Sequence, residues 1–189
     1  MSETNIYVGV AGYVGRPEDV GAVGVFRRAA DGGNWEHTFG AHETYTVFVH
    51  PGDSNLIFAG TADGVWRSQD RGATFHRTEF PDQDVQVWSF LTVEGRPDRL
   101  YAGASPINVY RSDDRGQSWR RLPTPDIEER CRGPFNSRVM RMVQTPGRPD
   151  EIYAALEIAG AMRTTDGGET WEDLGEGLVQ LSELPHLKS

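Results

Sequence analysis

Three charged side chains of this 189-residue chain are candidates for catalysis: Glu43, Glu157 and Arg138. Glu157 lies between two apolar residues just after an apolar run, where a polar side chain can point into a cleft. Hydrolysis of a glycosidic bond needs two carboxylates about 5–10 Å apart across the sugar. An arginine beside them suits an acidic ligand, because a guanidinium binds both oxygens of a carboxylate. The alternative role for Arg138 is an ion pair with an acidic residue of a neighbouring structural unit.

Five residues are predicted to bind a ligand, and Arg138 is one of them. Trp88 lies outside the repeated pattern described below, so its ring is free to act as a stacking surface, and Asn136 precedes Arg138 by two positions. Tyr13 and Arg16 lie in a long Gly-rich insertion, which is typical of a lid or binding loop. The alternative for this insertion is a passive excursion on the surface.

The sequence predicts neither a metal site nor a bound cofactor. The five histidines show no close ligand spacing, and the single cysteine, Cys131, has no histidine beside it. A phosphate-binding loop of the G-x-x-x-x-G-K type is also absent from the sequence.

Aspartates recur in the pattern Arg-[Ser/Thr]-x-Asp-x-Gly-x-[Ser/Thr]-aromatic, with a worn fourth copy near the N-terminus. The residues that define the pattern are Asp70 with Gly72, Asp114 with Gly116, Asp166 with Gly168, and Asp31 in the worn copy. A carboxylate can accept hydrogen bonds from the backbone of a turn, and glycine can adopt a positive φ without strain. One chemical role seldom needs several copies, so these aspartates are predicted to build turns rather than to catalyse.

Each copy joins two short apolar runs, as expected for a hairpin between two strands. One further strand candidate precedes each hairpin, and in three of the units a second candidate lies before it across a Pro-containing turn. The aligned arginines of the pattern are separated by 40, 44 and 52 positions. A period of 40–50 residues with four antiparallel strands is typical of a β-propeller blade. The predicted blades are residues 5–40, 41–80, 84–123 and 136–175, within a single domain, followed by a tail at 176–189.

The repeated hairpin resembles the BNR or Asp-box propeller group, which includes sialidases, sortilin-type receptors, some xyloglucan-active hydrolases and photosystem II assembly factors. The resemblance covers nearly the whole chain and implies an all-β protein built of four-stranded antiparallel blades. It also implies that the first strand of each blade lines a central channel, and the candidates for that lining are Thr44, Thr46, Trp88, Asn136, Arg138 and Arg141. A sialidase needs an arginine triad and an N-terminal Arg-Ile-Pro segment; this chain has no such segment, and Arg138 alone does not rebuild the triad.

The first unit lacks its first strand, so closure of the ring is an open question. Val179–Leu184 could return as the missing strand and close a four-bladed ring. Alternatively, the four blades are part of a longer propeller, or two chains pair to complete the ring. An incomplete ring is favoured, because the C-terminal stretch has few β-branched residues.

The net charge and the lack of long apolar runs limit the kinds of partner that are expected for this chain. A net charge of −9 argues against nucleic acid, whose phosphates require clustered Lys and Arg. The sequence has neither an apolar run of membrane-spanning length nor a leader pattern, so a cytoplasmic protein with no membrane partner is expected. The main hypothesis is a binding or assembly module for a carbohydrate or protein ligand, acting through the loop face and the channel. The alternative is a glycoside hydrolase with its pocket on the propeller axis.

Overall fold

The computed structural model describes residues 4–12, 21–127 and 136–175. Tyr13, Arg16, Cys131 and the tail with Val179–Leu184 lie outside the described residues. The described part is all-β and contains no helix long and apolar enough to cross a membrane. It forms four antiparallel sheets in which strands adjacent in sequence are adjacent in space.

The strands fall into four consecutive groups, one for each sheet. The first sheet contains β1 (Asn5–Val10), β2 (Gly24–Ala29) and β3 (Glu36–Phe39). The second contains β4 (Thr44–Val49), β5 (Ile57–Thr61), β6 (Gly64–Ser68) and β7 (His76–Arg77). The third contains β8 (Gln86–Val93), β9 (Arg96–Ser105), β10 (Asn108–Ser112) and β11 (Arg120–Arg121). The fourth contains β12 (Val139–Thr145), β13 (Arg148–Leu156), β14 (Gly160–Thr164) and β15 (Glu172–Asp173).

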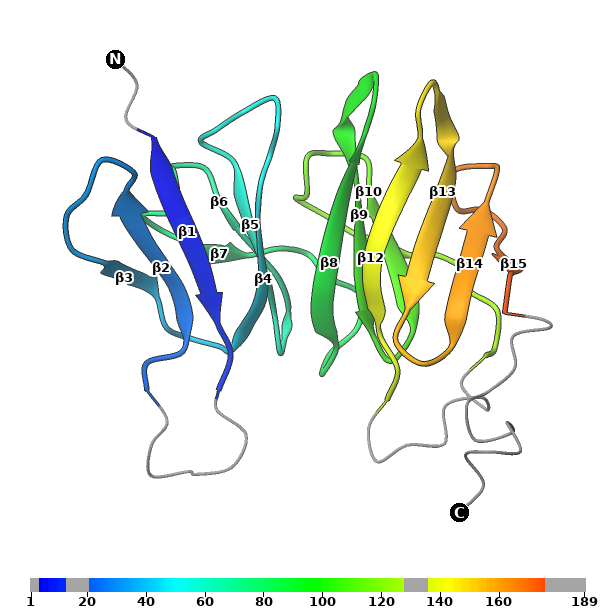
Figure 1. Cartoon of the computed structure of the whole chain (residues 1–189), viewed down its shortest axis with the longest axis horizontal. Coiled ribbons are helices and arrows are strands. Elements are labelled where there is room, and N and C mark those ends of the chain that lie inside the picture. Colours follow the sequence, from blue (N-terminus) through cyan, green and yellow to red (C-terminus); the bar gives the residue numbers. More distant parts are fainter. Residues whose placement is uncertain (1–3, 13–20, 128–135, 176–189) are drawn as a thin grey trace, which may run out of the picture.

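The four sheets follow one another from left to right as the blades of a propeller (Figure 1). The inner strands of the second, third and fourth sheets are β4, β8 and β12. This confirms the predicted fold class. Among the described residues the first sheet has three strands, and β1 therefore occupies its inner edge. We refer to the sheets as blades 1 to 4 in chain order.

The Asp-box turns are built as a network around one carboxylate. In blade 3, Asp114 Oδ1 accepts bonds from the backbone N–H groups of Gln117 (2.9 Å) and Ser118 (3.0 Å) and from the Ser112 hydroxyl (2.7 Å). The Ser112 hydroxyl oxygen in turn accepts the N–H of Gly116 (2.8 Å). Asp70 and Asp166 accept the equivalent bonds from the hydroxyl two residues before them and from the N–H four residues after them, and the glycine N–H again donates to that hydroxyl, so all three carboxylates hold turns.

The structure adds one feature that the repeat pattern does not reveal. The residue between the box aspartate and the glycine also has a positive φ: 59° at Arg71, 60° at Arg115 and 71° at Gly167. Left-handed conformations are strained for side chains other than glycine, and the carboxylate network holds Arg71 and Arg115 in them. This conformation turns the backbone carbonyl of that residue toward the preceding blade.

Stability is expected to fall in acid because of these carboxylates. Bonds from Thr170 lower the pKa of Asp166 to about 2, and at Asp70 the bonds from Thr74 outweigh the opposing effect of burial and also lower the pKa to about 2. A depressed pKa in the folded state stabilises the fold above the unfolded value of 3.8, and this contribution is lost as pH falls from about 4 toward 2. Urea midpoints measured from pH 5 to pH 2 should decline in this window, and Asp70→Ala should decline less steeply than the wild type. Equal slopes for the two proteins would contradict the assignment.

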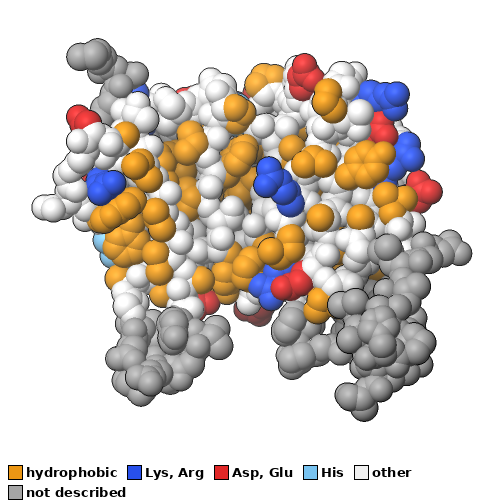
Figure 2. All heavy atoms as spheres, viewed as in Figure 1, with side chains coloured by type: hydrophobic (Ala, Val, Ile, Leu, Met, Phe, Trp, Pro, Cys, Tyr) orange, Lys and Arg blue, Asp and Glu red, His pale blue; other side chains and the backbone are white. Residues whose placement is uncertain are grey.

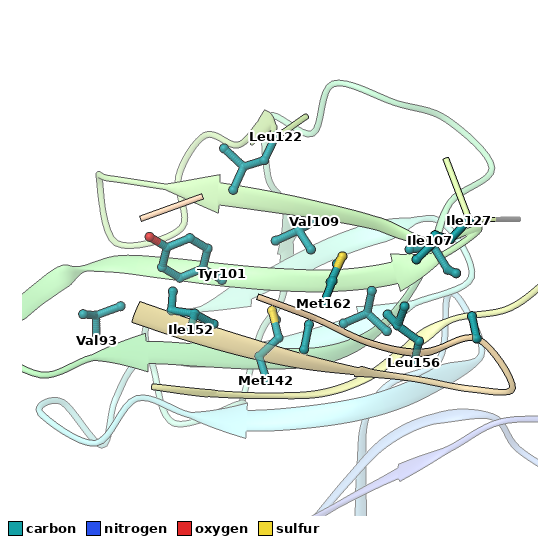
Figure 3. Close-up of a cluster of buried hydrophobic side chains, with 13 residues drawn as sticks. Val93, Tyr101, Ile107, Val109, Leu122, Ile127, Met142, Ile152, Leu156 and Met162 are labelled. Atoms are coloured by element: carbon teal, nitrogen blue, oxygen red, sulfur yellow. The ribbon is translucent and has the colours of Figure 1, made fainter. Parts of the chain in front are cut away.

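Apolar side chains from facing sheets fill the space between blades. The largest cluster joins blades 3 and 4 and includes Tyr101, Val109, Ile152, Met142 and Met162, all of which are nearly or fully buried (Figure 3). The aromatic residue that ends each Asp-box pattern was expected to pack in this way. The ones that do so are Phe75, Trp119 and Trp171. Trp35 of the worn copy does not, because it is 44% exposed.

An arginine of each of the first three blades donates to the Asp-box turn of the next blade. The acceptor is always the carbonyl of the residue after the box aspartate. The three bonds are Arg27 Nη1 to Arg71 O (3.0 Å), Arg67 Nε to Arg115 O (3.0 Å) and Arg111 Nη1 to Gly167 O (3.1 Å). We call this bond the inter-blade latch; it explains why arginine opens every copy of the pattern.

An aromatic side chain accompanies each latch. The Tyr7 and Tyr101 hydroxyls donate to the same carbonyls as the latch arginines of their blades, at 2.9 and 2.8 Å. Phe58 holds this position in blade 2 and packs on Gly116, where a Cβ would lie 2.2 Å from the phenyl ring. The Asp-box glycine is therefore required for close packing between blades as well as for its backbone conformation.

Candidate functional site

A β-bulge interrupts each inner strand near its start. The ladder skips one residue in β4, β8 and β12, and the skipped residues are Tyr45, Trp88 and Met140. A bulge leaves its extra residue unpaired and redirects the side chain. All three bulges lie at the end of the blades opposite the Asp-box turns, since the Asp boxes follow the third strand of each antiparallel sheet.

Tyr45 and Trp88 stack on each other, and Arg138 covers Trp88. The Tyr45 and Trp88 ring centroids are 4.2 Å apart with an interplanar angle of 15°. The guanidinium carbon of Arg138 lies 3.9 Å from the Trp88 ring centroid, in a cation–π contact. Tyr45 comes from blade 2 and Arg138 precedes the inner strand of blade 4, so the two cover opposite faces of the blade 3 indole. We call these three residues the bulge stack.

Each end of the bulge stack carries one of the predicted catalytic carboxylates. Glu157 Oε2 lies 2.5 Å from Arg138 Nε in an ion pair. At the other end, Glu43 accepts bonds from the Tyr45 hydroxyl (2.9 Å) and from the backbone N–H of Gly12 (3.1 Å). Burial and the bond to Glu43 raise the pKa of Tyr45 to about 12, so this hydroxyl remains a donor at neutral pH.

The structure therefore brings Glu43, Trp88, Arg138 and Glu157 into one row, but it does not place the two carboxylates across a shared opening. The bulge stack separates them, and each carboxylate is bound to donors of the protein. The alternative role of Arg138 was an ion pair with an acid of a neighbouring blade; its partner Glu157 instead follows β13 of the same blade. Trp88 has both faces covered and offers neither of them as a stacking surface.

A groove of about 700 Å³ crosses β4, β8 and β12 beside the bulge stack. Apolar side chains of Phe48, Phe90, Leu91, Met140 and Val143 line it together with polar ones, and Trp88 of the bulge stack borders it. Figure 2 shows hydrophobic side chains spread over this face of the molecule, where β1, β4, β8 and β12 lie.

The charged lining of the groove consists of Arg141 and Glu94. Arg141 is exposed and forms no ion pair with the described residues. Glu94 lies at the turn between β8 and β9, where its carboxylate accepts the N–H of Gly147 at 3.3 Å and its own N–H donates to Gln144 at 2.7 Å. The guanidinium of Arg141 is thus the positively charged group in the described lining of the groove.

Asn136 lies in a smaller polar pocket of about 180 Å³ together with Arg138. The other lining residues are Asp84, Gln86, Ser105 and Pro106. Among the described residues, no group of three or more His, Cys, Asp or Glu is placed to hold a metal ion.

Sequence reasoning missed Tyr45 as part of this site, although it named Arg141 as a channel candidate. A signal for Tyr45 was present, because Tyr45 and Trp88 occupy the same place in their blades. Each is the skipped residue directly before the one that pairs with a strand glycine, Thr46 with Gly60 and Ser89 with Gly103. Arg141 was a channel candidate because it and Arg138 lie three positions apart in one predicted strand, so their side chains point to opposite faces.

Comparisons with known proteins agree with this architecture. The model of the Sortilin-Vps10 family, described as "Sortilin, neurotensin receptor 3", matches residues 25–182. A search of curated proteins found no match.

Several solved structures share the fold at low sequence identity. The GH74 xyloglucanase from Xanthomonas campestris superposes with a TM-score of 0.69 at 18% identity over 95% of this chain, and an ancestral GH74 enzyme with 0.65 at 21% over 78%. YCF48 from Cyanidioschyzon merolae superposes with a TM-score of 0.52 at 19% identity over 74% of this chain. The chain spans only 29%, 21% and 40% of the lengths of these three proteins.

The solved structures therefore show the propeller fold, and the family model shows descent within the Asp-box propellers. The match of this family model covers most of the chain. It includes the inner strands β4, β8 and β12 and the three intact Asp-box turns. This chain belongs to the Sortilin-Vps10 family.

Proposed function

We propose that this propeller is a binding module that takes an extended segment of a partner protein into the groove on its inner strands. The segment that fits combines an apolar side chain with a carboxylate. Apolar walls suit the first, and the Arg141 guanidinium suits the second. The groove volume of about 700 Å³ lies in the usual range for ligand sites.

The observation that carries this proposal is the contrast between the groove and the bulge stack. The acids that could catalyse glycoside hydrolysis are bound within the protein, and the indole that could hold a sugar is covered on both faces. The groove beside them retains exposed apolar surface and the exposed Arg141 guanidinium, which forms no ion pair within the described part of the chain. The xyloglucanase and YCF48 share the fold at under 20% identity, so their activities do not decide between a hydrolase and a binding module.

Selection from a random 12-residue peptide library tests the proposal. We expect selected peptides to contain an apolar residue near Asp, Glu or a free C-terminus. Fluorescence anisotropy with one such peptide should give a dissociation constant that Arg141→Glu raises at least tenfold, because the charge facing the carboxylate is reversed. Arg148→Glu is the matched control: its side chain is 70% exposed and lies outside the groove, so binding should not change.

A glycoside-hydrolase activity would show itself differently. Cleavage of aryl glycosides that is lost in Glu157→Gln and kept in Arg141→Glu would overturn the binding-module proposal. Failure to select any peptide, or equal weakening by Arg141→Glu and Arg148→Glu, would overturn the assignment of the groove.

A further inference from the structure

The two outermost sheets carry positions that are fully buried in the middle of the chain. The second strands of the blades align by register, because the residues opposite the latch arginines Arg27, Arg67, Arg111 and Arg163 are Tyr7, Phe58, Tyr101 and Tyr153. The residues on either side of this aromatic position face the preceding blade. Ile57, Ala59, Leu100 and Ala102 are fully buried there, whereas Ile6 and Val8 in blade 1 are 38% and 40% exposed.

The opposite face of blade 4 is uncovered in the same way. Tyr101 and Phe58 are fully buried against the next blade, while Tyr153 is only half-buried and Ala155 and Val143 are exposed. We call the side of a blade that packs on the next blade its forward face, and the side that packs on the preceding blade its rear face. Blade 4 exposes its forward face, and blade 1 exposes its rear face. The blades form an open arc in which these two end faces do not meet.

The forward face also carries a latch without its acceptor. Arg163 and Tyr153 occupy the register positions whose equivalents, Arg27 with Tyr7 and Arg111 with Tyr101, donate to the next Asp-box carbonyl. In blade 4 the Tyr153 hydroxyl donates instead to Glu151 at 3.0 Å, and Arg163 lies 3.3 Å from the same carboxylate. The Arg163 Nε is buried and has no hydrogen-bond partner among the residues that the structure describes.

We propose that the forward face of blade 4 docks the rear face of blade 1 in a second copy of this chain, head to tail. Arg163 and Tyr153 would then donate to the carbonyl of Gly32, which follows Asp31 as Arg71, Arg115 and Gly167 follow their box aspartates. Gly32 is exposed and has a positive φ of 128°. Ile6 and Val8 would cover Tyr153 and Val143, as Ile152 covers Tyr101 in the chain itself.

The residue at position 155 selects this partner over an ordinary four-stranded blade. The inner strand of the next blade approaches Gly60 and Gly103 so closely that a Cβ there would meet Val87 O at 2.6 Å and Val139 at 2.6 Å. Blade 4 has Ala155 at this place, opposite Arg141 on β12. Its Cβ would clash with the inner strand of a fifth blade packed in the same way, whereas blade 1 has no such strand among the described residues.

The same contact at both ends closes a ring of two copies. Such a ring contains eight blades, within the four to eight that propellers adopt, and it leaves neither end face exposed. The interface is heterologous, because each copy contributes a different face at each of the two contacts.

The mass in solution tests this inference. Sedimentation equilibrium of the wild type at tens of micromolar should give twice the 21.0 kDa mass of one chain. Val8→Lys and the double variant Arg163→Ala/Tyr153→Phe should each weaken association at least tenfold. Val49→Lys is the matched control, since Val49 is 39% exposed, as Val8 is 40% exposed, but lies on blade 2 between the end faces. It should leave the mass unchanged.

A mixing experiment distinguishes this interface from a symmetric one. The Val8→Lys chain keeps an intact forward face, and the Arg163→Ala/Tyr153→Phe chain keeps an intact rear face. Mixing the two restores one of the two contacts, so the mixture should associate more strongly than either variant alone and more weakly than the wild type. A monomeric wild type, a dimer that withstands both variants, or a mixture that associates no more strongly than the separate variants would overturn the proposal, and near-ultraviolet circular dichroism verifies that each variant is folded.

Discussion

Replacing Asp114 by alanine is expected to lower the free energy of unfolding by about 3 kcal/mol. The carboxylate accepts bonds from two backbone N–H groups and from the hydroxyls of Ser112 and Ser118. Its loss removes several charge-assisted bonds at once and releases Arg115 from its left-handed conformation. The latch from Arg67 ends on the Arg115 carbonyl, so packing between blades 2 and 3 should loosen as well. Urea denaturation followed by tryptophan fluorescence measures the change.

Asp31 provides the matched control for this variant. It stands in the worn copy of the pattern, and no hydrogen bond or ion pair reaches its carboxylate from the described residues. Asp31→Ala should change stability by less than about 0.5 kcal/mol. Equal losses in Asp31→Ala and Asp114→Ala would show that the Asp-box network does not stabilise the blade.

Replacing Trp88 by alanine is expected to cost about 3 kcal/mol as well, because it removes the middle member of the bulge stack. Tyr45 loses its stacking partner, and Arg138 loses a cation–π contact at 3.9 Å. These contacts join blades 2, 3 and 4, so thermal unfolding should also become less cooperative. Calorimetry of Trp88→Ala measures both the stability and the sharpness of the transition.

Trp35→Ala is the comparison for that variant. The Trp35 ring is 44% exposed and is covered by Arg28 at 5.0 Å from its centroid. Its removal should cost less than about 1 kcal/mol. If Trp88→Ala proved as mild as Trp35→Ala, the bulge stack would not be a structural element.

The fold could be predicted from the sequence because its determinants are local and repeated. Asp70, Asp114 and Asp166 each bind donors within four residues of themselves, so the pattern alone specifies the turn. The first blade was predicted to lack one strand, and among the described residues its sheet has three.

The site was less predictable because it depends on contacts between blades. Trp88, Arg138 and the two glutamates were recognised as a group, but their order in space follows from three β-bulges that no residue pattern announces. Tyr45 separates Glu43 from Trp88 only because its bulge turns the ring toward blade 3. The latch was hidden for the same reason: the acceptor of each arginine is a backbone carbonyl of another blade.

A crystal structure of this chain tests the central claim most directly, namely that the candidate catalytic residues form a structural stack beside a binding groove. We predict that Trp88 lies between the Tyr45 ring, at about 4.2 Å, and the Arg138 guanidinium, at about 3.9 Å, with Glu43 and Glu157 bound at opposite ends. An exposed Trp88 face with the Glu43 and Glu157 carboxylates about 5–10 Å apart across an open pocket would contradict the claim and favour a glycoside hydrolase.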